Sequence, residues 1–341
     1  MFIEIQTISQ YEKEKQNWTL IFSLTFFAFS IILLRNFPSL FYSIHQFQFK
    51  FKLKFNGKTN SSNFEYPHTL SFVAIVKNEG PYIKEWIEYH KIVGVTKFYI
   101  YDNDSKDNIS EILKPYIKSG EVTYTYFPGH PVQIKAYNDC VQKYKNQTQY
   151  MGFIDIDEFV VPIQKNNLIE PIEELMNAKK NIAGVGINWL IYGSNGFQSK
   201  PRGLVIENYR KRSNFDQHIK TICDPRKIKE VVSPHSASFI RPFYAVNENG
   251  KKIKKGSPFN RKCRYKKLRI NHYHTKSLEE YKAKIKRGRA TTNETRDLTM
   301  FYHVFMNSKV YDYNLEKYVP QLKKILNITD NFDDDSISLQ T

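Results

Sequence analysis

Apolar runs and segments of helical periodicity alternate along the middle of the chain. Four runs that are apolar, or that alternate apolar and polar positions, predict strands at residues 71–76, 97–101, 121–127 and 150–155. The segments between them predict helices at residues 81–95, 110–117 and 134–144. Because strands that are joined through a crossover helix pair in parallel, this order predicts an α/β fold with a mostly parallel central sheet.

A separate apolar segment lies near the N-terminus. Trp18–Leu34 is an uncharged run of 17 residues, and at about 1.5 Å per residue a helix of this length approaches the thickness of a bilayer. A cleaved signal peptide would have a basic segment before the run and small residues after it, and neither is present. A buried core helix would show a polar face. We therefore expect one N-terminal transmembrane helix.

The pattern divides the chain into five parts. Residues 43–66 alternate aromatic residues with lysine and then become rich in Asn and Ser, which is typical of a stem, although a strand lying on the membrane would fit as well. The expected organisation is an N-terminal tail at 1–17, a transmembrane anchor at 18–37, a stem at 38–66, an α/β domain at 67–310, and a C-terminal helix with an acidic tail at 311–341.

Composition and charge narrow the class of protein. Hydrophobic residues make up 41% of the 341, which suffices for a packed core and excludes a chain that is disordered throughout. Three cysteines exclude a disulfide scaffold. The net charge is +17, and residues 251–290 hold 16 Lys and Arg against two Glu. Such a block indicates a polyanionic partner, a phosphorylated ligand or a membrane surface.

Polar clusters follow three of the predicted strands. In open α/β sheets, ligands bind at the carboxyl ends of the strands, so these clusters are candidates for a site. Asp155 and Asp157 come directly after the fourth strand. In an extended chain both carboxylates would point to one side, and two such groups repel unless a cation lies between them. Mg²⁺ and Mn²⁺ prefer oxygen ligands of this kind, so the pair predicts a metal site.

Several motifs, in their order along the chain, resemble glycosyltransferase family 92. They are VKNEGPYIKEWIEYHKIVGVTKFYIYDNDSKDN, QIKAYNDC, FIDIDEFVVP, NWLIYGSNGF and RINHYHTKS, between about residues 70 and 290. The resemblance implies a GT-A type domain, similar to glycosyltransferase family 2, that binds a nucleotide sugar. It further implies Mn²⁺- or Mg²⁺-dependent transfer of a sugar, with galactose as one candidate, from a UDP-linked donor to a glycan acceptor with inversion.

The same resemblance implies roles for individual residues. Asp155 and Asp157 would hold the metal, with His272 as a late ligand and His274 as its alternative. The nucleotide sugar would contact Lys77, Asn78, Glu79, Asp102, Asp104 and Asp155. Gln133, Tyr137 and Asn138 match the family as well, and Tyr137 could equally be a packing residue. Trp189, Tyr192 and Gly193 would contact sugar or form a core turn, and the diphosphate would meet Lys276, Lys286, Arg287 and Arg289.

The catalytic base stays open at this stage. An inverting enzyme needs a base for the acceptor hydroxyl, and Glu207 and Asp216 are candidates by position alone. Two other functions remain open beside transfer. A nucleic-acid-binding protein or metal-dependent nuclease could use the basic block at 251–290, and a nucleotidyltransferase would share the carboxylate–metal chemistry. With a transmembrane anchor, we expect no nucleic-acid partner.

Two signals disagree about location. The charges flanking the apolar segment favour a cytosolic C-terminal part. Family precedent favours a single-pass Golgi protein with a luminal catalytic domain, or the cytosolic face of the membrane in a bacterium. Six Asn-x-Ser/Thr sequons follow the apolar segment, at Asn60, Asn103, Asn108, Asn146, Asn293 and Asn327. We expect the luminal arrangement.

Overall fold

The first half of the fold is a parallel sheet built from four strands. The computed structural model describes residues 66–329 except 263 and 293, so the expected transmembrane anchor, nearly all of the stem and the acidic tail lie outside the described residues. The strands run in the order β3-β2-β1-β4. They are β1 (His68–Val76), β2 (Lys97–Asp102), β3 (Val122–Tyr126) and β4 (Thr148–Phe153). All three pairings are parallel, which confirms the four predicted strands.

Alternate residues of these strands pack on opposite faces of the sheet. Phe72 and Phe98 join the core on one face, where α3 (Gly80–Ile92), α4 (Ile109–Lys118) and α6 (Ile169–Asn177) pack. Val73 and Tyr99 join the core on the other face, under α5 (Gln133–Tyr144). The helices that connect the strands thus pass from one face of the sheet to the other between β1 and β4. In open α/β sheets, ligands bind at such a point.

The second half of the sheet is mixed. The order continues from β4 through β8, β6 and β12 to β5, and β11 joins β6 at its side. These strands are β5 (Glu158–Pro162), β6 (Ile182–Ile191), β8 (Ile219–Cys223), β11 (Tyr244–Asn247) and β12 (Leu268–His272). β8 is antiparallel to both neighbours and β5 is antiparallel to β12. The expectation of a mostly parallel sheet therefore holds for the first half only.

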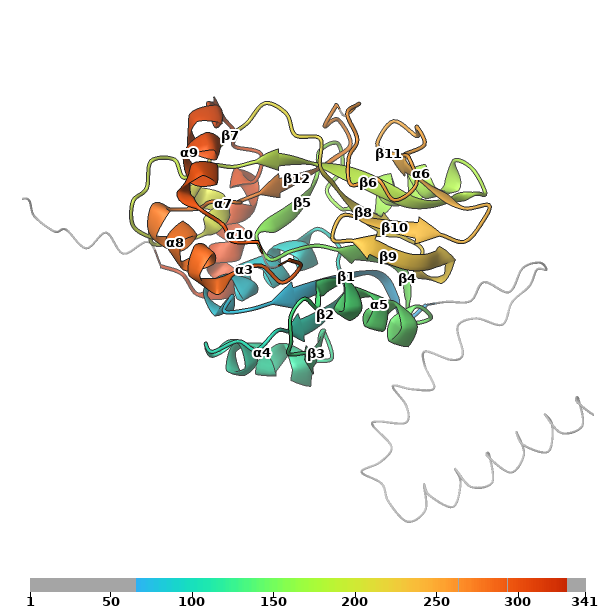
Figure 1. Ribbon diagram of the computed structural model, residues 1–341, viewed down its shortest axis with the longest axis horizontal. Helices are drawn as coiled ribbons and strands as arrows, with labels where there is room; N and C mark the ends of the chain where they lie inside the picture. The colour runs from blue at the N-terminus through green and yellow to red at the C-terminus, as the bar shows by residue number, and fades with distance from the viewer. Residues whose placement is uncertain (1–65, 263, 293, 330–341) are drawn as a thin grey trace, which may run out of the picture. The chain divides into compact units, whose positions relative to one another are not determined.

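Smaller elements lie at the two ends of the sheet. In Figure 1, α7 (Val205–Asn208), α8 (Leu278–Arg287), α9 (Leu298–Asn307) and α10 (Val319–Leu326) gather with α3 at one end, and the pair β9 (Ile228–Ser233) and β10 (Ser236–Phe239) lies toward the other. The remaining elements are β7 (Lys211–Arg212), β13 (Val310–Tyr311) and the 3-10 turns η2 (Pro225–Lys227) and η3 (Glu316–Tyr318). Within residues 66–329, no helix is both long and apolar enough to cross a bilayer.

A capping box sets the start of α8, which later supplies the site. The Ser277 hydroxyl accepts a hydrogen bond from the Glu280 backbone N–H at 3.2 Å, and the Glu280 carboxylate accepts one from the Ser277 N–H at 3.0 Å. This reciprocal arrangement satisfies two of the free N–H groups of a helix start. It fixes the register of α8, so that Lys284 and Arg287 reach the sheet edge.

Candidate active site

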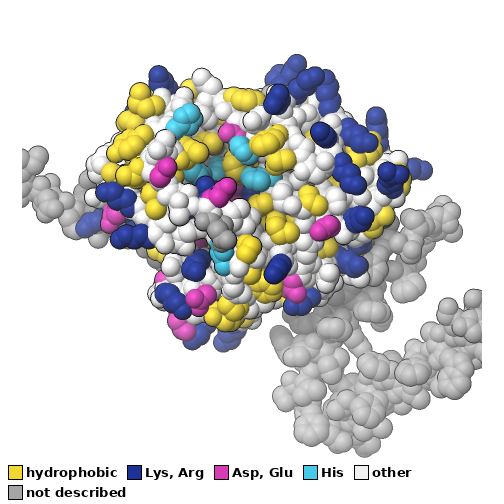
Figure 2. Space-filling view, viewed as in Figure 1, with side chains coloured by type: hydrophobic (Ala, Val, Ile, Leu, Met, Phe, Trp, Pro, Cys, Tyr) yellow, Lys and Arg dark blue, Asp and Glu magenta, His cyan; other side chains and the backbone are white. Residues whose placement is uncertain are grey.

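A cleft of about 830 Å³ opens beside the carboxyl ends of β1 and β4. Its walls come from the loops after β1, β4 and β12, from β6, from His218 just before β8, from the turn between β9 and β10, and from helix α8 and the residues that follow it. Figure 2 looks onto this face, where histidine side chains gather in a hollow beside an apolar patch. Sequence-distant segments therefore meet where the α/β topology predicts a ligand site.

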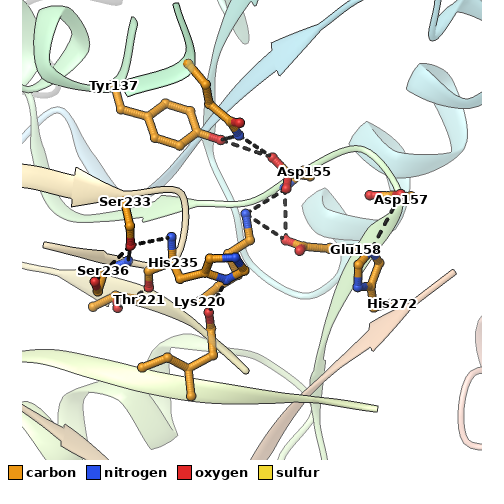
Figure 3. A network of polar contacts seen from close by, with 12 residues as sticks. Tyr137, Asp155, Asp157, Glu158, Lys220, Thr221, Ser233, His235, Ser236 and His272 are labelled. Atoms are coloured by element: carbon orange, nitrogen blue, oxygen red, sulfur yellow. Dashed lines mark hydrogen bonds and ion pairs between the residues drawn. The ribbon is translucent and has the colours of Figure 1, made fainter. Parts of the chain in front are cut away.

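The two aspartates of the Asp-x-Asp motif lie in a turn and diverge. The Glu158 N–H donates to the Asp155 carbonyl at 3.0 Å, so the chain turns before it enters β5. In a turn, residues two apart do not share a side as they do in a strand. Figure 3 shows the Asp155 carboxylate directed to Tyr137 and Lys220, and the Asp157 carboxylate directed to His272. The expectation that both carboxylates face one ligand is therefore not met.

Asp155 is held by a buried lysine. The Lys220 ammonium lies 2.7 Å from one Asp155 oxygen and 3.4 Å from Glu158, and the Lys220 side chain is fully buried. The other Asp155 oxygen accepts hydrogen bonds from Gln133 and Tyr137, both at 3.1 Å. Burial alone would lower the pKa of Lys220, but the two carboxylates outweigh it and raise that pKa. The ammonium thus supplies the positive charge that the motif led us to expect from a metal.

Asp157 has a lysine and a histidine beside it. The Lys284 ammonium lies 2.6 Å from Asp157 Oδ2, and His272 Nε2 lies 3.5 Å from the same oxygen. Burial disfavours the charged carboxylate, yet Lys284 and His272 hold the pKa of Asp157 well below its usual range. Lys284 itself has a lowered pKa, because burial and the nearby Lys276 and Arg296 outweigh its pairing with Asp157. Asp157 is therefore a carboxylate at neutral pH.

Asp157 and His272 fit a metal that shares its coordination with a ligand. Among the described residues, no group of three or more His, Cys, Asp or Glu side chains could hold an ion. Divalent ions in phosphate-transfer sites, however, are commonly bound by one or two protein groups plus phosphate oxygens. The Asp157 carboxylate and the His272 imidazole converge, and His272 Nδ1 is buried without a hydrogen-bond partner. Asp155 does not join them.

Positive charge accumulates in the same cleft. Lys77, Lys284, Arg287, Arg289 and Arg296 line the cleft. Burial lowers the pKa of Arg296, and the neighbouring guanidinium groups of Arg289 and Arg287 lower it further. The effect of these two groups on Arg296 shows that three guanidinium groups lie close to one another here, and an anion would relieve their mutual repulsion. The cleft is therefore suited to an anion.

Several polar atoms of the cleft wall are buried without a hydrogen-bond partner in the described part of the chain. They are Glu79 Oε2, Trp189 Nε1, His272 Nδ1, His274 Nδ1, Tyr281 OH and Arg289 Nε. Buried polar groups in native proteins nearly always find a partner, so this concentration in one cleft indicates a polar ligand.

The predicted nucleotide contacts divide into two groups. Lys77, Glu79 and Asp155 line the cleft, with Asn103 as an addition that the motif analysis missed. Asn78, Asp102 and Asp104 belong to the same sheet edge and are not cleft-lining. Asn78 binds the backbone of Lys106, Asp102 accepts hydrogen bonds from Ser105 and Tyr124, and Asp104 pairs with Lys106. These contacts order the loops after β1 and β2.

The other predicted residues are equally divided. Gln133, Trp189, Arg287 and Arg289 line the cleft together with His272 and His274. Tyr137 lies behind it, bonded to Asp155. Five others lie outside the cleft wall. Asn138 binds the backbone of Val231, and Tyr192 contacts Arg269. Gly193 packs on Ser308, Lys276 lies over the ring of Tyr82, and Lys286 lines a second pocket.

The two candidates for a catalytic base lie in different places. Glu207 pairs with Lys323 at 2.6 Å on α7 and does not line the cleft. Asp216 accepts hydrogen bonds from His218, and that imidazole does line the cleft. Reasoning from the sequence missed His218, Lys220, His235 and Arg296. None of them belongs to a motif, and only the pairing of β8 with β4 and β6 brings Lys220 to Asp155.

Proteins of a plant and a nematode are similar in sequence to this chain. A glycosyltransferase family 92 protein of Ricinus communis is 26% identical over 230 residues, which cover 67% of this chain and 39% of that protein. The beta-1,4-galactosyltransferase galt-1 of Caenorhabditis elegans is 25% identical over 231 residues, 62% of this chain and 49% of that protein. The chain therefore spans less than half the length of these relatives.

A solved structure gives a more distant comparison. S. aureus TarS 1–349 in complex with UDP aligns with a TM-score of 0.31 at 12% identity, over 46% of this chain and 47% of that chain. This alignment covers less than half of either chain. The model of the family described as glycosyltransferase family 92 matches residues 73–325, which contain the whole cleft. On that match, the chain belongs to glycosyltransferase family 92.

Proposed function

We propose that this protein is a metal-dependent hexosyltransferase. It moves a sugar from a nucleotide-sugar donor, UDP-linked, to a hydroxyl group of a glycan acceptor, with inversion at the anomeric carbon. The observation that carries the proposal is the cleft at the sheet edge, in which Asp157 and His272 lie beside a group of closely spaced cations. A nucleoside diphosphate with a divalent ion complements both features.

The chain's own groups have separable tasks in this proposal. Lys284, Arg289 and Arg296 bind the diphosphate and stabilise the negative charge that grows on it as the sugar leaves. Lys77, Glu79 and Asn103, at the ends of β1 and β2, bind the nucleoside. Asp155, held by Lys220, Gln133 and Tyr137, accepts hydrogen bonds from donor hydroxyl groups.

Asp157 and His272 would hold the Mn²⁺ or Mg²⁺ ion. Such an ion, when bound, acts as a Lewis acid on the departing diphosphate. Because Lys284 occupies one oxygen of Asp157, we expect this ammonium to turn toward the phosphate oxygens when the donor binds. Galactose as the transferred sugar is supported by the name of the nematode relative. The expected anchor at 18–37 and the luminal Golgi location are part of the same proposal.

The test uses the full-length chain. Purified protein is incubated with a panel of UDP-sugars, Mn²⁺ and a mixture of glycan acceptors, and both the glycan product and released UDP are measured. We expect transfer with one donor, and tight UDP binding only with the metal present. Asp157→Asn removes a metal ligand and should lower transfer by about a hundredfold or more, whereas the exposed Glu111→Gln should not change it.

The alternatives give different results in the same assay. Release of pyrophosphate in place of UDP would identify a nucleotidyltransferase. Cleavage or a salt-sensitive shift of DNA or RNA, without sugar transfer, would favour use of the 251–290 block for nucleic acid. Unchanged transfer by Asp157→Asn would refute the metal assignment alone.

A further inference from the structure

We propose that His218, oriented by Asp216, is the general base that removes the proton of the acceptor hydroxyl. This inference rests on the proposed function and deepens it, because an inverting transfer needs such a base. It begins from a pair of side chains that no motif contains. His218 lies just before β8, and Asp216 precedes it by two residues.

The contact between the two side chains defines the protonation of the imidazole. His218 Nδ1 lies 2.8 Å from Asp216 Oδ1, and the His218 backbone N–H donates to the same oxygen at 2.7 Å. Since a carboxylate only accepts hydrogen bonds, Nδ1 carries a proton, and in the neutral imidazole Nε2 is then the atom with the lone pair. The Tyr265 hydroxyl holds the Asp216 backbone, at 3.0 Å from its N and 3.1 Å from its O.

Aromatic rings fix the plane of the imidazole. Trp189 stacks on it with ring centroids 5.0 Å apart, and Phe259 contacts it edge-on at 4.8 Å. The same Trp189 ring meets His272, the proposed metal ligand, at 4.2 Å. His218 and His272 thus contact one indole, so the base lies about one aromatic ring from the place where the donor diphosphate would bind.

Accessibility separates His218 from the other paired histidine. The cleft contains two histidines beside a carboxylate, His218 with Asp216 and His272 with Asp157. The His218 side chain is 36% exposed and that of His272 only 6%. A hydroxyl group of a large glycan acceptor must approach from solvent, so it can reach His218.

The remaining histidines in the cleft are less suited to the role. Burial, followed by the charge of Lys220, lowers the pKa of His235 to about 3. His274 is buried, and its pKa is lowered well below the usual range. His130 and His303 have no carboxylate partner in the described part of the chain, and His130 Nε2 is engaged by the Arg289 carbonyl.

The carboxylates that line the cleft near the aspartate motif each carry a cation. Glu79 pairs with Arg287, Asp155 with Lys220 and Asp157 with Lys284. A carboxylate paired with a buried cation is a weaker base, because the cation stabilises its charged form. Asp297 also lines the cleft, but its carboxylate caps α9 and accepts a hydrogen bond from the Thr299 N–H at 2.9 Å. The dyad of Asp216 and His218 offers an accessible lone pair one indole ring from His272.

The proposed step is a substitution at the anomeric carbon. The acceptor oxygen forms a bond to the anomeric carbon while the bond between that carbon and the donor phosphate oxygen breaks. The electron pair of the broken bond leaves with the nucleoside diphosphate, and the acceptor proton passes to His218 Nε2. The imidazolium that results is stabilised by Asp216, and nothing is oxidised or reduced. Attack opposite the leaving group inverts the anomeric carbon.

The first test is kinetic and uses the full-length chain with the donor that supports transfer. His218→Gln should lower kcat by about 10² to 10⁴ while the Kd for UDP with Mn²⁺ changes by less than about threefold. His68→Gln, remote from the cleft, serves as the matched control and should leave both unchanged. His218→Ala should be rescued in part by added imidazole, because the missing side chain leaves space beside Trp189.

The pH profile supplies a readout that a purely structural role would not move. We expect the acidic limb of kcat/KM to disappear in His218→Gln. In Asp216→Asn, kcat should fall while the Kd for UDP with Mn²⁺ changes by less than about threefold, since the imidazole loses the carboxylate that orients it. Among the residues that the structure describes, Asp216 and His235, whose ring lies 5.6 Å from that of His218, are the titratable groups that contact the imidazole.

The outcomes distinguish the two proposals. Absence of transfer by the unmodified protein with every donor would overturn the proposed function and this assignment together. Normal transfer by the unmodified protein, with kcat and an acidic limb retained in His218→Gln, would overturn the base and leave the proposed function standing. Loss of UDP binding in that variant would indicate a structural role and overturn the base too. If the His218 variants do not fold, Asp216→Asn decides: a kcat equal to that of the unmodified protein would overturn the base.

Discussion

At the scale of single residues, two lysines determine how the carboxylates of the aspartate motif are paired. Lys220 and Lys284 each pair with one of its carboxylates, at 2.7 and 2.6 Å. Burying a carboxylate is unfavourable unless a counter-charge accompanies it. The protein itself therefore supplies a counter-charge to both aspartates, and Asp157 is the one that also has a histidine, His272, beside it.

Removing the first of these lysines should destabilise the fold strongly. Lys220→Met leaves Asp155 and Glu158 without their buried partner, and breaking such a pair typically costs about 3–5 kcal/mol. We expect this loss in the free energy of unfolding from urea denaturation. The loss should be smaller at about pH 5 than at about pH 8, because burial raises the pKa of Glu158 and this carboxylate can protonate at the lower pH.

Two further variants calibrate that result. Lys143→Met, at an exposed pair with Asp139, should cost at most about 1 kcal/mol. Glu158→Gln added to Lys220→Met should restore part of the stability, since one buried carboxylate is then neutral. Equal stability of Lys220→Met and Lys143→Met would show that the Lys220 ion pairs are not essential to the fold.

At the scale of elements, a buried glutamate ties α7 to α3. Glu85 of α3 accepts hydrogen bonds from the N–H groups of Val205 at 2.8 Å and Ile206 at 3.0 Å, which begin α7. Burial raises the pKa of Glu85 from 4.5 to about 7, and the two hydrogen bonds only partly oppose that shift. The attachment of α7 should therefore respond to pH.

The sign of that response follows from the raised pKa. A carboxyl group with a higher pKa in the folded state stabilises the fold fully below the pKa of the unfolded state. This stabilisation is lost as the pH rises toward the folded value. Between about pH 4.5 and 7, we expect Glu85 to contribute a fall of about 3 kcal/mol in the free energy of unfolding.

The comparison with a variant isolates this contribution from other titrating groups. Glu85→Gln should be less stable at low pH, because its amide can accept only one of the two hydrogen bonds, and its stability should change less between pH 5 and 7, at about those values. Glu111→Gln, at an exposed position, should follow the unmodified protein. Parallel pH curves for Glu85→Gln and the unmodified protein would contradict the assignment.

At the scale of the whole molecule, folding divides the basic block between several places. Lys284, Arg287 and Arg289 line the cleft, while Lys267 pairs with Glu174 on the surface. In Figure 2, Lys and Arg side chains lie mainly around the rim of the face that holds the cleft. This distribution suits a local anion better than a long polyanion, which would be expected to bind along a continuous basic stripe.

Glycosylation tests the proposed luminal location. Only a sequon whose asparagine is exposed in the fold can be expected to carry a glycan. Asn108, Asn146 and Asn327 are exposed, whereas Asn103 is buried and its amide donates to the Phe127 and Gly129 carbonyls. In microsomes, we expect the protein to be protected from added protease and to shift on endoglycosidase treatment. Asn146→Gln should remove one glycan, and Asn103→Gln none. Digestion of the C-terminal part by the protease would place it in the cytosol.

The sequence alone determined the first half of the fold and the edge where the site lies. Strands β1 to β4 and helices α3 to α5 follow from local hydrophobic periodicity, because each buries one face against its neighbours in the chain. The position of Lys77, Glu79 and Asp155 at that edge follows from the parallel topology. The family also followed from the sequence, because each of its motifs is a continuous stretch of the chain.

Only the tertiary structure decided the partners within the site. The turn between Asp155 and Glu158 separates carboxylates that an extended chain would have aligned. Lys220 reaches Asp155 through β8, and Lys284 reaches Asp157 through α8. Only the fold places the dyad of Asp216 and His218 near His272, because both imidazoles contact the ring of Trp189. Charge pairing acts through space between segments that are far apart in the chain. The hydrophobic periodicity of a sequence therefore cannot predict it.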